Sequence, residues 1–135
     1  MLKNYYEFIS KNNFDLGLQM GRAFWRESQA RLIRQKQAGH WKKKTAVGKK
    51  YLAVTEKYFP KYVEELKGYA LGTKIKFTDL WTASLEDEVE NEHCTTVITA
   101  GGRLIGHSDD YSEKNYSDAK NDTVIVKKTI GQLTI

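Results

Sequence analysis

The sequence contains a single cysteine, Cys94, and its neighbours are residue types that support the chemistry of a thiol. His93 precedes it directly, and His107, Asp109 and Asp110 follow a short distance later. A thiolate is a strong nucleophile, and a lone cysteine with histidine and aspartate nearby is compatible with covalent catalysis. We therefore take Cys94 as the candidate nucleophile.

A β-hairpin would bring these residues together. Residues 95–99, TTVIT, favour a strand, and residues 103–106 favour a second one. Gly101-Gly102 between them is a two-residue hairpin signal, because both glycines can adopt positive φ. The hairpin predicts that Cys94 lies at the same end of the two strands as His107-Ser108. The plainer interpretation is a small buried cysteine beside a polar hairpin end.

Three arrangements of these residues stay open. A cysteine–histidine pair, as in papain-like enzymes, would lower the pKa of the thiol, although that nucleophile usually begins a helix and not a strand. A metal site from His93, Cys94, His107 and Asp110 would mix soft and hard ligands. An N-terminal nucleophile would arise if the chain were cut just before Cys94. The freed α-amine, with a pKa of about 8, could then accept the proton of its own thiol, with a pKa of about 8.5.

Residues 1–93 are predicted to be helical. One continuous helix face is indicated by residues three or four positions apart: Phe14, Leu18, Gly21, Trp25, Ser28 and Leu32. Gly17 and Gly21 would let another backbone approach this helix closely. A second helix is indicated by the same spacing in Tyr51, Val54 and Tyr58. Pro60 suits the first turn of a third helix that Gly72 would end, and Thr78 is a candidate N-cap of a fourth.

Residues 94–135 are predicted to form antiparallel strands. After the hairpin, TVIVKKT at 123–129 indicates a third strand, and a turn at Gly131-Gln132 leads to a fourth at 133–135. The predicted fold class is α+β, in a single domain with a helical segment, 1–93, and a β segment, 94–135. Such a sheet would end with open edges, which native proteins usually pair or cover. We therefore expect partner strands from another chain or from a C-terminal region beyond residue 135.

Composition limits the classes of protein that fit. Of the 135 residues, 40% are hydrophobic and 29% are charged, as in globular proteins. No apolar run approaches the roughly 18 residues of a membrane span, and no apolar segment near the N-terminus suits a secretory signal. One cysteine excludes an internal disulfide and a four-cysteine zinc site. We expect a cytoplasmic protein with no membrane partner, no metal and no cofactor.

The net charge of +5 is concentrated in the first third of the chain. Residues 1–50 carry 12 basic and three acidic side chains, and the densest cluster is Lys42-Lys43-Lys44 with Lys49 and Lys50. A basic surface can attract an anionic ligand. No nucleic-acid-binding motif surrounds this cluster, however, and a solvated helix face accounts for it. Nucleic acid is therefore not an expected partner.

Four segments of the chain together resemble one known family. Residues 60–72, PKYVEELKGYALG, match the pattern P-x-Y-x-E-E-L-x-G-x-A-x-G, and residues 79–80 with the acidic 85–88 follow. Cys94-Thr95-Thr96 matches a C-T-T nucleophile motif, and residues 106–111, GHSDDY, resemble G-H-N-x-D-W. In this order the segments resemble the acyl-coenzyme A:6-aminopenicillanic acid acyltransferase family, whose members are autoproteolytic N-terminal nucleophile (Ntn) hydrolases.

The resemblance implies a fold and a set of roles. The fold would be an αββα sandwich, and the chain would cut itself between His93 and Cys94. Mature Cys94 would take an acyl group from an amide or thioester and pass it to an amine or to water, while Asp110 would orient the nucleophile. The implied partners are a small-molecule acyl donor and acceptor, with a coenzyme A thioester as a candidate donor, and the cleaved segment itself. Substrate-binding residues are not assigned.

The chain also departs from the family pattern. Ser108 stands where the family usually has Asn, and Tyr111 stands where it has Trp. The family fold needs a much longer chain, so we expect these 135 residues to be its front part, without the later donors that stabilise an oxyanion. The alternative is a non-catalytic, truncated domain that binds a partner through an open sheet edge or its basic helical surface.

Overall fold

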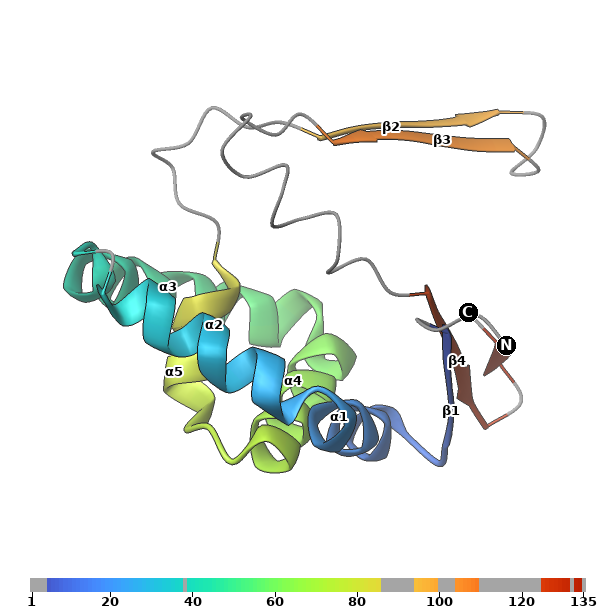
Figure 1. Ribbon diagram of the computed structural model, residues 1–135, viewed down its shortest axis with the longest axis horizontal. Coiled ribbons are helices and arrows are strands. Elements are labelled where there is room, and N and C mark those ends of the chain that lie inside the picture. The colour runs from blue at the N-terminus through green and yellow to red at the C-terminus, as the bar shows by residue number, and fades with distance from the viewer. Residues whose placement is uncertain are drawn as a thin grey trace. The chain divides into compact units, whose positions relative to one another are not determined.

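The structure is a computed structural model, and it describes residues 5–37, 39–85, 94–99, 104–109, 125–131 and 133–134. The chain divides into two compact units, Met1–Glu86 with Val126–Ile135, and Asp87–Ile125. Within the described residues, the helices are α1 (Asn13–Ala23), α2 (Trp25–Gln37), α3 (Trp41–Tyr58), α4 (Pro60–Thr73) and α5 (Phe77–Ser84), all in the first unit (Figure 1).

The strands form two separate sheets. They are β1 (Tyr5–Ser10), β2 (Cys94–Thr99), β3 (Leu104–Asp109), β4 (Ile125–Ile130) and β5 (Leu133–Thr134). One sheet has the order β1-β4-β5, and the other pairs β2 with β3. The mixed α+β class predicted from the sequence is confirmed, whereas the αββα sandwich stays a prediction.

The first unit is built around the contact between α1 and α4. Two pairs of glycines meet there, Gly17 and Gly21 on α1 with Gly68 and Gly72 on α4. A Cβ added at Gly17 would overlap the backbone carbonyl oxygen of Glu65, and additions at the other three glycines would also collide with backbone atoms. The two backbones are therefore in direct contact, which confirms the prediction that Gly17 and Gly21 allow a close approach.

The first described residues form a strand, which corrects the prediction that 1–93 is helical throughout. In β1 the alternate residues Phe8 and Ser10 are buried, as in a half-buried strand. Gly131 N–H donates to the Ser10 carbonyl at 3.0 Å, and Ser10 Oγ donates to the Thr129 carbonyl at 3.1 Å. β1 forms because a strand from the other end of the chain satisfies its backbone groups.

The helix face predicted from Phe14 to Leu32 is divided between two helices, α1 and α2, which meet at Phe24. The Phe24 ring packs edge-to-face on Tyr6, with ring centroids 4.7 Å apart, and lies 6.1 Å from Phe8. Both partners belong to β1. This aromatic contact supplies a physical reason for the break, because it holds Phe24 against the sheet.

Helix ends agree with the sequence in part. Pro60 begins α4 as predicted, but Gly72 does not end it, because α4 continues for one more residue and Lys74 then adopts a left-handed φ of 59°. Gly72 is instead required where α1 approaches. Thr78 is not the N-cap of α5, which begins after Lys76 with no side-chain capping bond. These corrections reflect packing between helices, which local sequence patterns do not contain.

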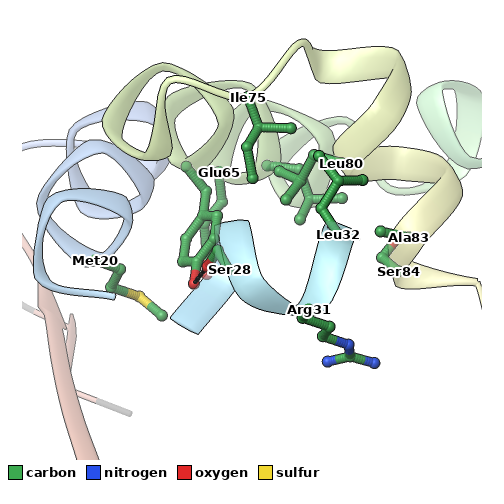
Figure 2. Close-up of a pocket in the computed structure, with 11 residues that line it drawn as sticks. Met20, Ser28, Arg31, Leu32, Glu65, Ile75, Leu80, Ala83 and Ser84 are labelled. Carbon is green, nitrogen blue, oxygen red and sulfur yellow. Dashed lines mark hydrogen bonds between the residues drawn. The ribbon is translucent and has the colours of Figure 1, made fainter. Parts of the chain in front are cut away.

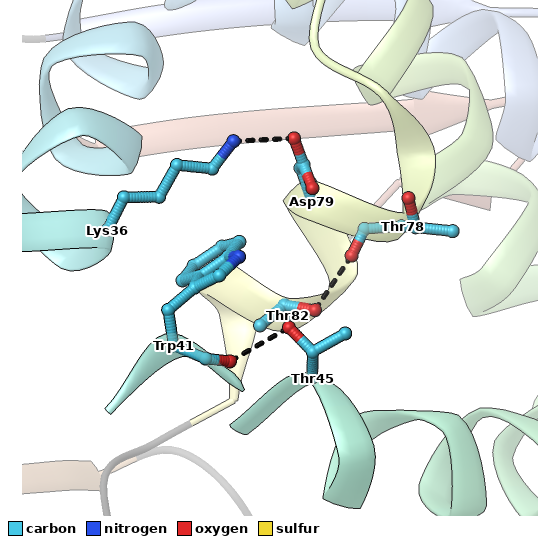
Figure 3. Close-up of polar contacts among 6 residues, drawn as sticks. All are labelled: Lys36, Trp41, Thr45, Thr78, Asp79 and Thr82. Atoms are coloured by element: carbon cyan, nitrogen blue, oxygen red, sulfur yellow. Dashed lines mark hydrogen bonds and ion pairs between the residues drawn. The ribbon is translucent and has the colours of Figure 1, made fainter. Parts of the chain in front are cut away.

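Specific polar contacts hold α2, α3 and α5 together. The Trp81 indole N–H donates to the Gly48 carbonyl at 2.7 Å, in a buried bond between α5 and α3. Lys36 Nζ lies 2.7 Å from Asp79 Oδ2, and the same ammonium lies 5.3 Å from the centre of the Trp41 ring (Figure 3). These contacts fix α5, the last of the described helices before the candidate nucleophile in the chain.

The third predicted strand, 123–129, is found within the described residues as β4, Ile125–Ile130, and it joins the sheet of the first unit. Its Lys128 Nζ lies 2.8 Å from Glu65 Oε1 on α4. The first unit thus draws strands from both ends of the chain, so the predicted boundary between residues 93 and 94 does not separate helices from strands. None of the helices in the described ranges is both long and apolar enough to cross a membrane.

Candidate functional site

The second unit places the candidate nucleophile at the start of a strand. β2 and β3 pair antiparallel, and the register is Cys94 with Asp109, Thr95 with Ser108, Thr96 with His107, Val97 with Gly106, Ile98 with Ile105 and Thr99 with Leu104. The Cα atoms of directly opposite residues in such a pair lie about 4.5–5.5 Å apart. The backbone therefore brings the cysteine position next to an aspartate position.

Two of the predicted site residues, His93 and Asp110, lie outside the described residues, so the cleavage position and the orienting carboxylate stay predictions. Cys94 is described as the first residue of β2. The sequence placed Asp109 among the residues near Cys94, but its position directly opposite Cys94 was not predicted. The signal was available, because a two-residue turn at Gly101-Gly102, itself outside the described residues, requires this register.

A cavity of about 240 Å³ lies within the first unit (Figure 2). Its lining comes from α1, α2, α4 and α5 and from Ile75, between α4 and α5. The lining is mostly apolar and includes Met20, Leu32, Leu66, Ile75, Leu80 and Ala83. The sequence indicated Leu32 as an apolar helix position, but the space between the helices depends on how they pack.

Hydroxyl groups supply part of the polar lining of the cavity. Ser28 Oγ donates to the Phe24 carbonyl at 2.8 Å and lies 2.8 Å from the Tyr69 hydroxyl. Since the one Ser28 proton is used, the Tyr69 hydroxyl is the donor in the second bond. Burial raises the pKa of Tyr69 above its ordinary value, and the hydrogen bond with Ser28 offsets part of that shift. The Tyr69 hydroxyl is therefore neutral at physiological pH.

The charged groups that line the cavity are either ion-paired or exposed to solvent. Glu65 lines it and pairs with Lys128 at 2.8 Å, while Arg31 lines it from the exposed side of α2. The combination of an apolar lining with a neutral hydroxyl pair suits an uncharged group and provides no activated nucleophile.

Among the described residues, no group of three histidine, cysteine, aspartate or glutamate side chains could hold a metal ion. Comparison of the chain with family models, with curated proteins and with solved structures gives no match. The resemblance to the acyltransferase family therefore stays a prediction from the motifs.

Proposed function

We propose that this chain is an autoproteolytic cysteine N-terminal nucleophile enzyme, an acyltransferase or amidohydrolase that acts through a thioester on Cys94. The observation that supports the proposal best is the β2–β3 register, in which Cys94 begins a strand directly opposite Asp109. In the class that the motifs resemble, the nucleophile begins a strand, and cleavage just before it exposes its amine. The αββα sandwich and a cytoplasmic location, where a thiol stays reduced, belong to the same proposal.

Maturation begins when the Cys94 thiolate attacks the preceding residue and ends when water frees the thiol again. The Cys94 thiolate attacks the carbonyl carbon of His93, the peptide C–N bond breaks, and the nitrogen takes a proton to become the free α-amine of Cys94. The product is a thioester between the His93 carbonyl and the Cys94 sulfur. Water hydrolyses it to the His93 carboxylate and the free thiol, which leaves Cys94 as a new N-terminus.

The mature residue combines nucleophile and base. The freed α-amine, with a pKa of about 8, accepts the proton of the thiol, which then attacks the carbonyl of an amide or thioester donor. The acyl group moves to sulfur and the amine or thiol leaves with a proton. An amine acceptor or water then releases the acyl group. A coenzyme A thioester is the candidate donor, and Asp110 is the proposed orienting carboxylate.

Intact-mass spectrometry of the purified chain, with Cys94→Ala alongside, tests the proposal. We expect two fragments that divide between His93 and Cys94 in the wild type and a single uncut chain in the variant, because alanine cannot attack the preceding carbonyl. Cys94→Ser is the matched control, since its hydroxyl supports the equivalent acyl shift more slowly. An uncut wild-type chain after prolonged incubation would contradict self-cleavage by these 135 residues on their own.

Hydroxylamine separates self-cleavage from a contaminating protease. It attacks a thioester but leaves a peptide bond intact, so in the wild type it should yield a hydroxamate at the carboxyl end of His93. A protease would yield a carboxylate at the same position and would also cut Cys94→Ala. Cleavage of the alanine variant would therefore argue against the cysteine mechanism.

A further inference from the structure

Helix α3 carries an apolar stripe that the described residues of the first unit leave exposed. Tyr51, Val54 and Tyr58 are exposed by 52%, 56% and 63%, and half-buried Val47 extends the stripe by one turn. We call these four residues the α3 seam. Their spacing of four, three and four is that of the a and d positions of a coiled coil. The periodicity identified in the sequence is therefore real, but its face does not point into the core.

The seam is distinct from the face by which α3 packs. Gly48 is buried against the Trp81 side chain and accepts its indole hydrogen bond. On a helix with 3.6 residues per turn, the centre of the seam lies about a quarter of a turn away from Gly48. A helix with two apolar faces of this kind has one face available to a second element.

A row of lysines runs along one side of the seam. Lys43, Lys50 and Lys57 are all exposed and follow one another at seven-residue intervals. With Tyr51 and Tyr58 at a positions, these lysines occupy g positions, which in coiled coils select the partner by charge. The e positions, which include Gly48 and Thr55, lie toward the packed side and carry no charge. Charge selection by the seam thus comes from one row, and that row is basic.

We propose that the α3 seam docks an amphipathic helix of another protein whose flank is acidic. The seam from Val47 to Tyr58 spans about 16 Å, which corresponds to roughly two heptads of a partner helix. Apolar residues of that helix would cover the seam, and its glutamates or aspartates would face the lysine row. This inference does not depend on Cys94, so the Cys94→Ala variant should bind the same partner.

The charges favour this occupant over two others. A second copy packed antiparallel would oppose its lysine row to the same row, and a parallel copy would oppose it to the uncharged e side. An anionic membrane is normally bound by a broad apolar face with basic residues about it, whereas this seam is narrow and has its lysine row on one side only.

A synthetic helical probe tests the proposal. The probe is a fluorescein-labelled peptide of three heptads with leucine at a and d and glutamate at e and g, which prevents pairing with itself. We expect the full chain to raise its fluorescence anisotropy in a saturable, salt-sensitive manner. The double variant Lys50→Glu/Lys57→Glu should weaken binding by about tenfold or more, since two attractions become repulsions. A probe with lysine in place of glutamate should restore binding to that variant.

The matched control is Lys42→Glu/Lys49→Glu, which changes the net charge equally on exposed positions of α3 away from the seam. It should leave probe binding within about twofold. If the control variant loses as much probe affinity, binding depends on the general charge of the chain. If the lysine probe does not restore binding to Lys50→Glu/Lys57→Glu, the lysine row does not contact the probe. Either result overturns the proposal, provided that circular dichroism shows both variants folded.

The other occupants give results of their own. If the seam pairs with itself, sedimentation should show a dimer that Tyr51→Ser converts to a monomer, with no binding of the acidic probe. If it binds membranes, the chain should float with phosphatidylserine vesicles in a Tyr51-dependent manner and ignore the probe. Both outcomes contradict docking of an acidic helix. If the chain binds the probe but does not cleave itself, the proposed enzyme function is contradicted and the docking proposal is not.

Discussion

Cys94, the first residue of β2, lies directly opposite Asp109, the last residue of β3. The two positions are 15 apart in the sequence, yet antiparallel pairing sets their Cα atoms about 5 Å apart. A carboxylate that orients the nucleophile is part of the proposed mechanism, and the backbone pairing makes residue 109 a position from which one could act. The motif resemblance assigns this role to Asp110, and the register adds Asp109 as a second candidate.

Replacement of Asp109 tests the second candidate. We expect Asp109→Asn to slow cleavage between His93 and Cys94 by about 10²-fold, the lower limit for a group that assists proton transfer. The fraction of cut chain over time, read by mass spectrometry, gives the rate. Glu64→Gln removes one negative charge from an exposed site on α4 and should cleave at the wild-type rate. Equal rates in Asp109→Asn and the wild type would leave Asp110 as the only candidate.

The α1–α4 contact predicts a large cost for one added methyl group. Gly17→Ala would drive a Cβ into the Glu65 carbonyl oxygen, so we expect the free energy of unfolding to fall by about 2 kcal/mol or more. Gly39→Ala is the comparison, because Gly39 has a φ of 86° and open space around it. That variant bears only the cost of its backbone conformation, about 1–2 kcal/mol. Urea unfolding of both variants measures the difference, and a smaller loss at Gly17 would contradict the packing described.

The indole bond between α5 and α3 should contribute measurably to stability. Trp81→Phe removes the donor and leaves the buried Gly48 carbonyl without its 2.7 Å partner. We expect a loss of about 1–3 kcal/mol in the free energy of unfolding. Trp25→Phe, at a tryptophan that is 46% exposed, should change it by no more than about 0.5 kcal/mol. Similar effects in the two variants would show that the indole bond is unimportant.

Alkaline pH should destabilise the first unit through Tyr69. Burial raises the pKa of Tyr69 in the folded chain, so the unfolded chain loses this proton first, from about pH 10 upward. The associated stability is fully present below that pH and is lost as the pH rises through the folded pKa. Unfolding free energies of the wild type should therefore fall more steeply with pH than those of Tyr69→Phe. Parallel curves would contradict the burial of this hydroxyl.

Several features could be predicted because their causes are local. Pro60 begins α4 since its fixed φ and missing N–H are harmless in the first turn of a helix. The β-forming runs on either side of Gly101-Gly102 pair antiparallel, in the register that the predicted hairpin requires. The regular spacing of Tyr51, Val54 and Tyr58 belongs to one helix, α3. Each of these depends on residues within a few positions of one another.

Other features were decided by contacts between distant parts of the chain. Residues 5–10 form a strand because β4, more than a hundred positions later, satisfies their hydrogen bonds. Gly72 lies inside α4, where the backbone of α1 is in direct contact with it. The break between α1 and α2 occurs at Phe24, whose ring packs on β1.

For function, the sequence by itself determined which residue is the candidate nucleophile, because the chain has one cysteine and a recognisable motif around it. The tertiary structure showed that the Tyr51–Val54–Tyr58 face, whose spacing alone fits a core face equally well, is exposed. Residue types define what chemistry is available, whereas distances and exposure arise only when separate elements pack, since each helix or strand can present the same pattern to core, partner or solvent.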